Sequence, residues 1–192
     1  FIHSRFSFAP EAEISVEVDP RELHRSHIEA LHEAGFRRMS MGVQDFDLQV
    51  QESVNRIQPE WVSRQVYTWA KELGFESINL DLMYALPDQT LDEALQDIQT
   101  ALSFSPQHLS CYHLTLEPNT LFHRNPPALP DDDTSGEMQQ RIEEMLAAQG
   151  YQHYETSAFA LPKRRAKHNL NYWKFGDYLG IGAGAHSKLS FS

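Results

Sequence analysis

The chain has 192 residues, of which 41% are hydrophobic and 22% are charged, the composition of a folded globular protein with its own core. Its formal net charge of -11 argues against general electrostatic binding to nucleic acid or to an anionic membrane. The single cysteine, Cys111, excludes an internal disulfide and favours a reducing compartment.

Strands and helices are expected to alternate along the first 160 residues. Val62, Val66, Trp69 and Leu73, for example, have the spacing of one helical face. The pattern predicts strands at 13–19, 38–43, 77–83, 108–116 and 152–158, with helices at 22–34, 62–73, 91–102 and 138–146 between them.

The expected ends of these helices have local signals. Gly35, Gly74 and Gly150 each follow a helical stretch and precede an aromatic residue, as expected for glycine in a left-handed closing turn. Thr90 and Asp88 are candidate caps before the helix at 91–102, and the run "DDDTS" offers caps before the helix at 138–146.

Alternation of strand and helix predicts an α/β fold with a parallel sheet, either open or closed into a barrel. We expect one domain over residues 1–192. Residues 1–160 would form the βα units, and residues 161–192 a glycine-rich C-terminal return segment.

Polar side chains recur on one face of several strands. In "SINLDLMYALP", Ile78, Leu80 and Leu82 share one face while Asn79 and Asp81 share the other. The same phase places Glu17, Gln44 and Thr115 near the C-terminal ends of their strands.

Parallel α/β proteins bind ligands at the C-terminal ends of their strands. Each polar residue taken alone is explained by hydrogen bonds to a neighbouring loop. Four in one strand phase favour a shared ligand site in which Glu17, Gln44, Asp81 and Thr115 ring one pocket, with Arg56 as a partner for the carboxylates. Carboxylates and amides suit a ribose, an adenine or an amino-acid head group.

Longer stretches resemble a known family. "EISVEVDPREL", "MSMGVQDFDLQVQESVNRIQP" and "NLDLMYALPDQT" resemble the oxygen-independent coproporphyrinogen III oxidases, which are radical S-adenosylmethionine (SAM) enzymes. "LTLEPNTLF", "HNLNYW" and "FGDYLGIGAGAH" are similar to the related HemW-type heme chaperones. The resemblance implies a (β/α)6 partial TIM-like barrel with SAM and a [4Fe–4S] cluster at the C-terminal ends of its strands.

The resemblance also implies roles for particular residues. Glu17 matches a contact to one SAM molecule, and Gln44, Arg56 and Asp81 match contacts to a second. Thr115 and His186 align more loosely with two further contact positions. In the chaperone branch His168 or His186 would contact heme, because neutral imidazole is a usual axial ligand of heme iron.

The chain departs from the family pattern in its cysteines. The family cluster is held by three thiolates in a C-x3-C-x2-C loop, whereas Cys111 stands alone and reads as a buried core thiol. We expect the cluster cysteines and the first βα units to belong upstream of Phe1, so that this chain contains no catalytic residue and no metal ligand. Ala85 also replaces the glycine that the family usually has before "LP".

Several functions follow as hypotheses. The first is the SAM-binding part of a HemW-type chaperone that transfers heme to acceptor proteins. The second is part of a coproporphyrinogen oxidase, with "KRRAKH" as a cationic partner for substrate carboxylates. A metal-dependent hydrolase using Asp81, Glu17 and histidines is a third, although no H-x-H spacing occurs at a strand end.

The remaining hypothesis is that the chain alone is inactive, because its sheet would have an exposed edge. No signal peptide or long apolar run is apparent. We therefore expect a cytoplasmic protein that binds heme or a porphyrinogen, binds no nucleic acid, and meets membranes only through partner proteins.

Overall fold

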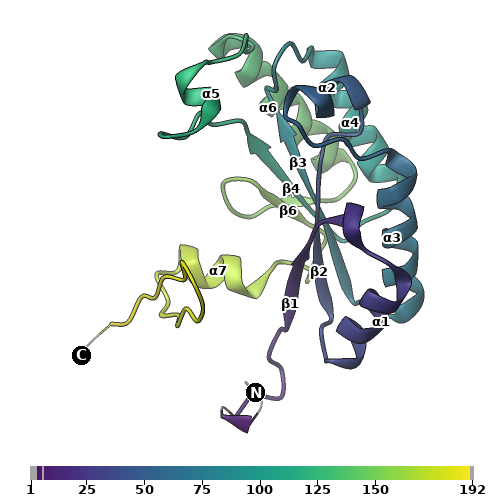
Figure 1. Cartoon of the computed structure of the whole chain (residues 1–192), viewed down its shortest axis with the longest axis vertical. Coiled ribbons are helices and arrows are strands. Elements are labelled where there is room, and N and C mark those ends of the chain that lie inside the picture. Colours follow the sequence, from purple (N-terminus) through teal and green to yellow (C-terminus); the bar gives the residue numbers. More distant parts are fainter. Residues whose placement is uncertain (1–3, 6, 191–192) are drawn as a thin grey trace.

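The structure is a computed structural model that describes residues 4, 5 and 7–190. Its strands form one sheet in the order β1-β2-β3-β4-β6-β5 (Figure 1). The first four are parallel neighbours, and the last two are antiparallel. Their bounds are β1 (Ser15–Val18), β2 (Arg38–Gln44), β3 (Ser77–Tyr84), β4 (His108–His113), β5 (Gln152–His153) and β6 (Ala158–Ala160).

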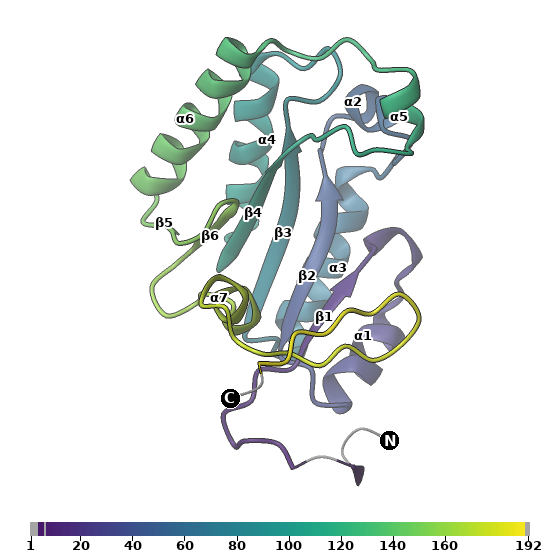
Figure 2. The same ribbon diagram turned by 90° about the vertical axis from the view of Figure 1, so that its left-hand side faces the viewer.

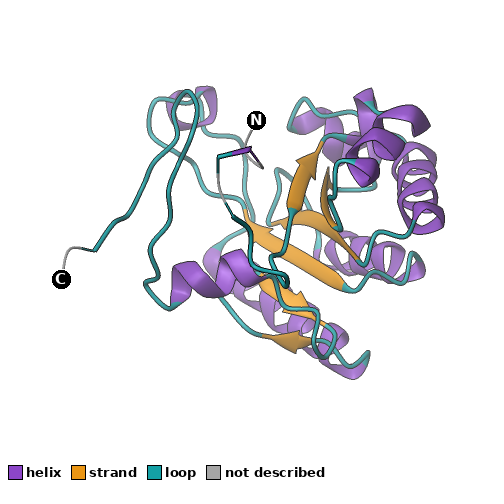
Figure 3. Cartoon of the chain, turned by 90° about the horizontal axis from the view of Figure 1, so that it is seen from below, coloured by secondary structure: helices purple, strands orange, loops and turns teal. Residues whose placement is uncertain are grey.

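The long helices lie on one side of the sheet, and α7 with the C-terminal segment lies on the other (Figures 1 and 3). The helices on the first side are α1 (Arg25–Glu33), α3 (Glu60–Leu73), α4 (Leu91–Ser103) and α6 (Asp132–Ala148). The shorter ones are the 3-10 helix η2 (Pro20–Glu22), α2 (Leu48–Ser53), α5 (Leu121–Arg124) and α7 (Lys167–Trp173). In Figure 2, α2 and α5 lie beyond the C-terminal ends of the strands, while α7 lies near their N-terminal ends.

The apolar strand faces form the core beneath the long helices. Met39, Met41, Ile78 and Leu80 are completely buried, and the helix stripes pack against them. Burial of one such side chain contributes about 1.5–3 kcal/mol. The predicted division of each strand into an apolar face and a polar face is confirmed for β2 and β3.

The three glycines predicted at helix C-terminal ends and the cap at Thr90 are confirmed, whereas α1 begins three residues later and α6 six residues earlier than predicted. Gly35, Gly74 and Gly150 have φ values of 98°, 92° and 84°, the left-handed region in which glycine meets no steric penalty. Thr90 caps α4 because its hydroxyl accepts from the amide of Glu93, while the carboxylate of Glu93 accepts from the amide of Thr90.

One predicted strand is wrong. Residues 152–158 do not form a single parallel strand, because the chain reverses after His153 and the amide of Tyr154 donates to the carbonyl of Ala158 at 3.1 Å. The polar residues 155–157 form this turn, which suits residues whose side chains compete for backbone hydrogen bonds. The returning strand β6 then pairs antiparallel with β4. Strand β4 also ends at His113, three residues earlier than predicted.

The residues that the structure describes include no helix long and apolar enough to cross a membrane. Separately, α7 lies within the predicted return segment 161–192, while the division of the chain at residue 160 stays a prediction.

Two buried carboxyl groups join the loop after β2 to α4. Asp45 accepts from the amide of Asp47 at 2.7 Å and from Gln89 at 3.0 Å, and Asp97 accepts from the amide of Phe46 at 2.9 Å. The two carboxyl groups are near enough to each other for the charge of one to affect the pKa of the other. Burial raises the pKa of both, and the charge of Asp45 raises the pKa of Asp97 further. The pair therefore retains a proton that it would release in the unfolded chain.

This pair predicts a pH-dependent stability. Since both folded-state pKa values lie above the ordinary 3.8, the folded chain binds more protons, and stability is lost as the pH rises above that value. Asp97→Asn removes the titration but retains a donor, so we expect it to raise the free energy of unfolding at pH 8 by about 1–3 kcal/mol. Urea denaturation at pH 4 and pH 8 measures this, with exposed Asp92→Asn on the same helix as control. A loss of stability at pH 8 would contradict it.

Candidate functional site

A polar pocket lies on the sheet face opposite the long helices. We call it the interior pocket, and its volume is about 260 Å³. Its floor comes from the polar phase of β1–β4, and one side comes from the first turn of α7. The lining residues are Ser15, Val16, Glu17, Arg38, Ser40, Gln44, Asn79, Asp81, His108, Ser110, Tyr112, Ala166, His168 and Asn169.

A second hollow of about 320 Å³ adjoins the C-terminal ends of the strands, and we call it the upper pocket. It shares Glu17, Ser40, Gln44 and Asp81 with the interior pocket. Four of the residues predicted from the sequence, Glu17, Gln44, Arg56 and Asp81, line it together. Three of the four residues expected from strand phase, Glu17, Gln44 and Asp81, therefore lie around one cavity together with Arg56, while their role in binding stays a prediction.

Asp81 is the most enclosed carboxylate of the pocket. Its Oδ2 accepts from the Ser40 hydroxyl at 2.7 Å, and its Oδ1 accepts from the Asn79 amide at 2.8 Å. Burial raises the pKa of Asp81, although hydrogen bonds from Ser40, Asn79 and Ser110 oppose that rise. A ligand that donates a hydrogen bond or carries positive charge would offset the cost of this buried charge.

The bulge at the end of β2 sets the direction of Gln44. The register shifts between Gly42 and Gln44, and Gln44 has a φ of 72°, which is uncommon for a residue with a side chain. A Cβ on Gly42 would lie 2.8 Å from Nη2 of Arg56, so the glycine leaves space for that guanidinium. Strain of this kind is frequent at binding sites.

Arg56 binds a different carboxylate from the ones expected. Its Nη2 lies 3.3 Å from Asp19 Oδ2 and 3.3 Å from the carbonyl of Gly42. Glu17 and Gln44 line both pockets, and among the described residues neither side chain makes a hydrogen bond. Both are therefore available to a ligand.

Two predicted residues lie elsewhere. Thr115 follows the early end of β4, is exposed, and donates to the carbonyl of His113 at 3.5 Å. His186 is exposed in the C-terminal segment, where its backbone packs against Gly180. Neither lines the interior pocket or the upper pocket, so their proposed SAM contacts stay predictions without support from this geometry.

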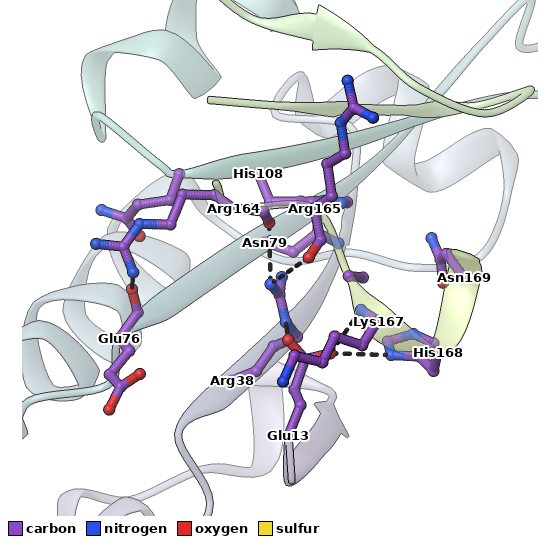
Figure 4. Close-up of polar contacts among 12 residues, drawn as sticks. Glu13, Arg38, Glu76, Asn79, His108, Arg164, Arg165, Lys167, His168 and Asn169 are labelled. Carbon is purple, nitrogen blue, oxygen red and sulfur yellow. Dashed lines mark hydrogen bonds and ion pairs between the residues drawn. The ribbon is translucent and has the colours of Figure 1, made fainter. Parts of the chain in front are cut away.

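His168 does line the interior pocket, at the α7 side. Its Nδ1 lies 3.6 Å from Glu13 Oε1, and Glu13 also accepts from the backbone amide of Lys167 at 2.9 Å (Figure 4). Glu13 Oε2 pairs with Nε of the buried Arg38 at 2.9 Å. A carboxylate on one imidazole nitrogen leaves the other nitrogen for an iron or another ligand.

Several lining residues were not identified from sequence as site residues. Asn79 and Ser40 had the right strand phase, and that signal would have included them. His108, which is buried at 2% exposure, lies at the start of β4, away from the end at which ligands were expected. Asn169 reaches the pocket only through the tertiary position of α7.

The pocket residues suit one of the two cofactors implied by the resemblance, SAM, but not the other, the [4Fe–4S] cluster. The pockets offer carboxylates, an amide and hydroxyls on rigid strands, the groups that hold a nucleoside and an amino-acid head group, so the residues fit SAM. They do not fit a [4Fe–4S] cluster, which needs several thiolates. Cys111 is buried within the core, and burial raises the pKa of its thiol. No group of three His, Cys, Asp or Glu side chains arranged for a metal ion was found in the described part of the chain.

Comparison with known proteins agrees with the fold. Residues 2–101 match the radical SAM superfamily. The heme chaperone HemW of Escherichia coli is 45% identical over 99% of this chain and 50% of its own length. HemW of Haemophilus influenzae is 44% identical with the same shares. The solved coproporphyrinogen III oxidase HemN of E. coli, a radical SAM enzyme, superposes with a TM-score of 0.84 at 31% identity, over 97% of this chain and 46% of its own.

The chain spans about half the length of the curated relatives it matches. The superposition on HemN confirms the predicted α/β class with its mostly parallel sheet. The family match covers more than half of the chain, and it includes the strands that carry Glu17, Gln44 and Asp81. The chain therefore belongs to the radical SAM superfamily.

Proposed function

We propose that this chain is the SAM-binding part of a HemW-type heme chaperone. The observation that carries the proposal is the convergence of Glu17, Gln44, Arg56 and Asp81 on one cavity at the C-terminal ends of the strands. The 45% identity to the E. coli heme chaperone supports the chaperone branch. The proposed whole protein binds heme and transfers it to acceptor proteins in the cytoplasm.

Each polar side chain of the upper pocket is assigned an interaction with SAM. Asp81 and Glu17 accept hydrogen bonds from ribose hydroxyls or amines, and Gln44 can donate as well as accept. Arg56, already held near the cavity by Asp19, supplies positive charge for the carboxylate of the methionyl group. When bound, SAM would supply a 5′-deoxyadenosyl radical and release methionine, given one electron from a reduced cluster that residues outside this chain would hold.

His168 is the proposed heme contact. It is half exposed at the side of the interior pocket, and Glu13 lies against its Nδ1. A carboxylate or carbonyl partner on one ring nitrogen raises the basicity of the other, as in many metal-binding histidines. His186, the alternative named from sequence, has no comparable partner among the contacts that the structure describes.

Hemin titration tests the heme part of the proposal. We expect a saturable Soret shift with the unmodified chain, a weaker affinity by about tenfold or more in His168→Ala, and no change in His186→Ala. Binding that is the same in all three proteins would remove His168 from the site. Calorimetric titration with SAM tests the other half, and absence of SAM binding would refute the SAM-binding assignment.

The oxidase is the alternative, favoured by the high structural similarity to HemN. In that reading the parent protein would remove carboxyl groups from porphyrinogen propionates, as the resemblance implies. Conversion of coproporphyrinogen III by the anaerobically reconstituted parent protein would establish it. SAM cleavage without porphyrin product would favour the chaperone.

A further inference from the structure

A continuous series of hydrogen bonds runs along the floor of the interior pocket from Asp81 towards α7. Asn79 Nδ2 lies 2.8 Å from Asp81 Oδ1, and Asn79 Oδ1 lies 2.6 Å from Nδ1 of His108. On the far side of the ring, Nε2 of His108 lies 2.7 Å from the hydroxyl of Tyr154. We call these four residues the polar chain.

The hydroxyl of Tyr154 contacts the first turn of α7. It accepts from the backbone amide of Ala166 and from Nδ2 of Asn169, both at 3.2 Å. Ala166 has no side chain that can cap the helix, so the free amides of this turn are satisfied from distant parts of the chain. Glu13 serves the amide of Lys167 in the same way (Figure 4). The position of α7 therefore depends on these two side chains.

The hydrogen bonds of the polar chain all have a consistent direction. Because Asn79 uses its Nδ2 to donate to Ser40 and Asp81, its Oδ1 must accept from His108. The imidazole therefore carries its proton on Nδ1 and accepts from the hydroxyl of Tyr154 at Nε2. Burial, with the nearby charge of Arg38, lowers the pKa of His108 to about 3, so the ring is neutral and this tautomer is retained.

We propose that His108 and Tyr154 are positioning residues that link the carboxylate of Asp81 to the turn of α7 that bears His168. The proposal rests on the proposed function, in which a ligand binds at each end. A ligand that fixes Asp81 also fixes the four hydrogen-bonded residues of the polar chain. A ligand on His168 fixes α7, and through Tyr154 it fixes these four residues from the other end. Each ligand thus lowers the ordering cost for the other, which gives reciprocal positive coupling.

The positioning role is tested first without ligands, in Tyr154→Phe. This change removes only the hydroxyl, while Tyr151→Phe is a matched control whose hydroxyl donates to the carbonyl of Pro106, outside the polar chain. We expect amide hydrogen exchange in residues 167–171 to become at least tenfold faster in Tyr154→Phe and to stay unchanged in Tyr151→Phe. Asn169→Ala, which removes one donor to Tyr154, should have a smaller effect in the same direction. Equal exchange in the two tyrosine variants would overturn the proposal.

The coupling is tested by hemin titration with and without saturating SAM. Allosteric coupling is typically about 5- to 150-fold, so we expect SAM to strengthen hemin binding at least fivefold in the unmodified chain and in Tyr151→Phe. In Tyr154→Phe the ratio should fall below about twofold. An unchanged ratio in Tyr154→Phe, or no coupling in the unmodified chain, would overturn the link. Failure of both ligands to bind would instead refute the proposed function, and hydrogen exchange would still decide the positioning role.

Discussion

Glu13→Gln is expected to lower the free energy of unfolding by about 3 kcal/mol, the lower end of the range for breaking a buried ion pair. The side chain of Arg38 is 7% exposed, and Glu13 is its ion-pair partner at 2.9 Å. The other partners of Arg38 are the carbonyls of Arg164 and Arg165, which carry no full charge. Without Glu13 the buried charge would therefore lose most of its compensation. Urea denaturation at pH 7 measures the loss.

Glu11→Gln is the matched control, since Glu11 bonds to the rest of the described structure only through its backbone carbonyl, which accepts from Nζ of Lys167. Its effect should be within about 0.5 kcal/mol. Acid titration gives a second check on Glu13. Burial by itself would raise the pKa of Glu13, but His168, Arg38 and the amide of Lys167 lower it to about 2. Its stabilising contribution is therefore present above pH 4.5 and is lost as the pH falls towards 2, a dependence that Glu13→Gln should lack.

The second large effect is expected at Asp81, where Asp81→Asn should weaken SAM binding by about 10- to 100-fold. Hydrogen bonds to a charged acceptor contribute about 1.5–3 kcal/mol, and the amide offers a weaker acceptor and an unwanted donor. The free energy of unfolding of Asp81→Asn should instead increase. Because burial raises the pKa of Asp81, its charge is a cost to the fold that the neutral side chain avoids. Calorimetric titration and thermal unfolding of the same samples measure both.

A loss of SAM affinity together with a gain in stability would distinguish a binding residue from a structural one. If Asp81 only held Ser40 and Asn79 in place, Asp81→Asn would lower stability and binding together. Asp133→Asn, at an exposed position in the first turn of α6, should leave SAM affinity unchanged. Retention of full SAM affinity in Asp81→Asn would remove the residue from the proposed site.

The local sequence pattern was sufficient to predict the faces of the strands and the ends of several helices. The alternation in β2 and β3 predicted both the buried apolar face and the polar face, because strand side chains point to opposite sides regardless of what packs on them. Glycines at helix ends and the cap at Thr90 were also correct, since those preferences depend on a few adjacent residues. Strand alternation placed Glu17, Gln44, Asp81 and Thr115 around one cavity, and the structure has the first three there and Thr115 outside it.

Only the tertiary structure decided how distant segments meet. The reversal at 154–157, which turns β6 antiparallel to β4, depends on pairing partners about 50 residues away and is not apparent in local periodicity. The same holds for Glu13, whose partners Arg38, Lys167 and His168 lie far along the chain. Sequence patterns report which face a residue occupies, whereas hydrogen-bond partners across the sheet follow from how the whole chain packs. The link from Asp81 through His108 to α7 therefore became apparent only when β4, the turn between β5 and β6, and α7 were placed together.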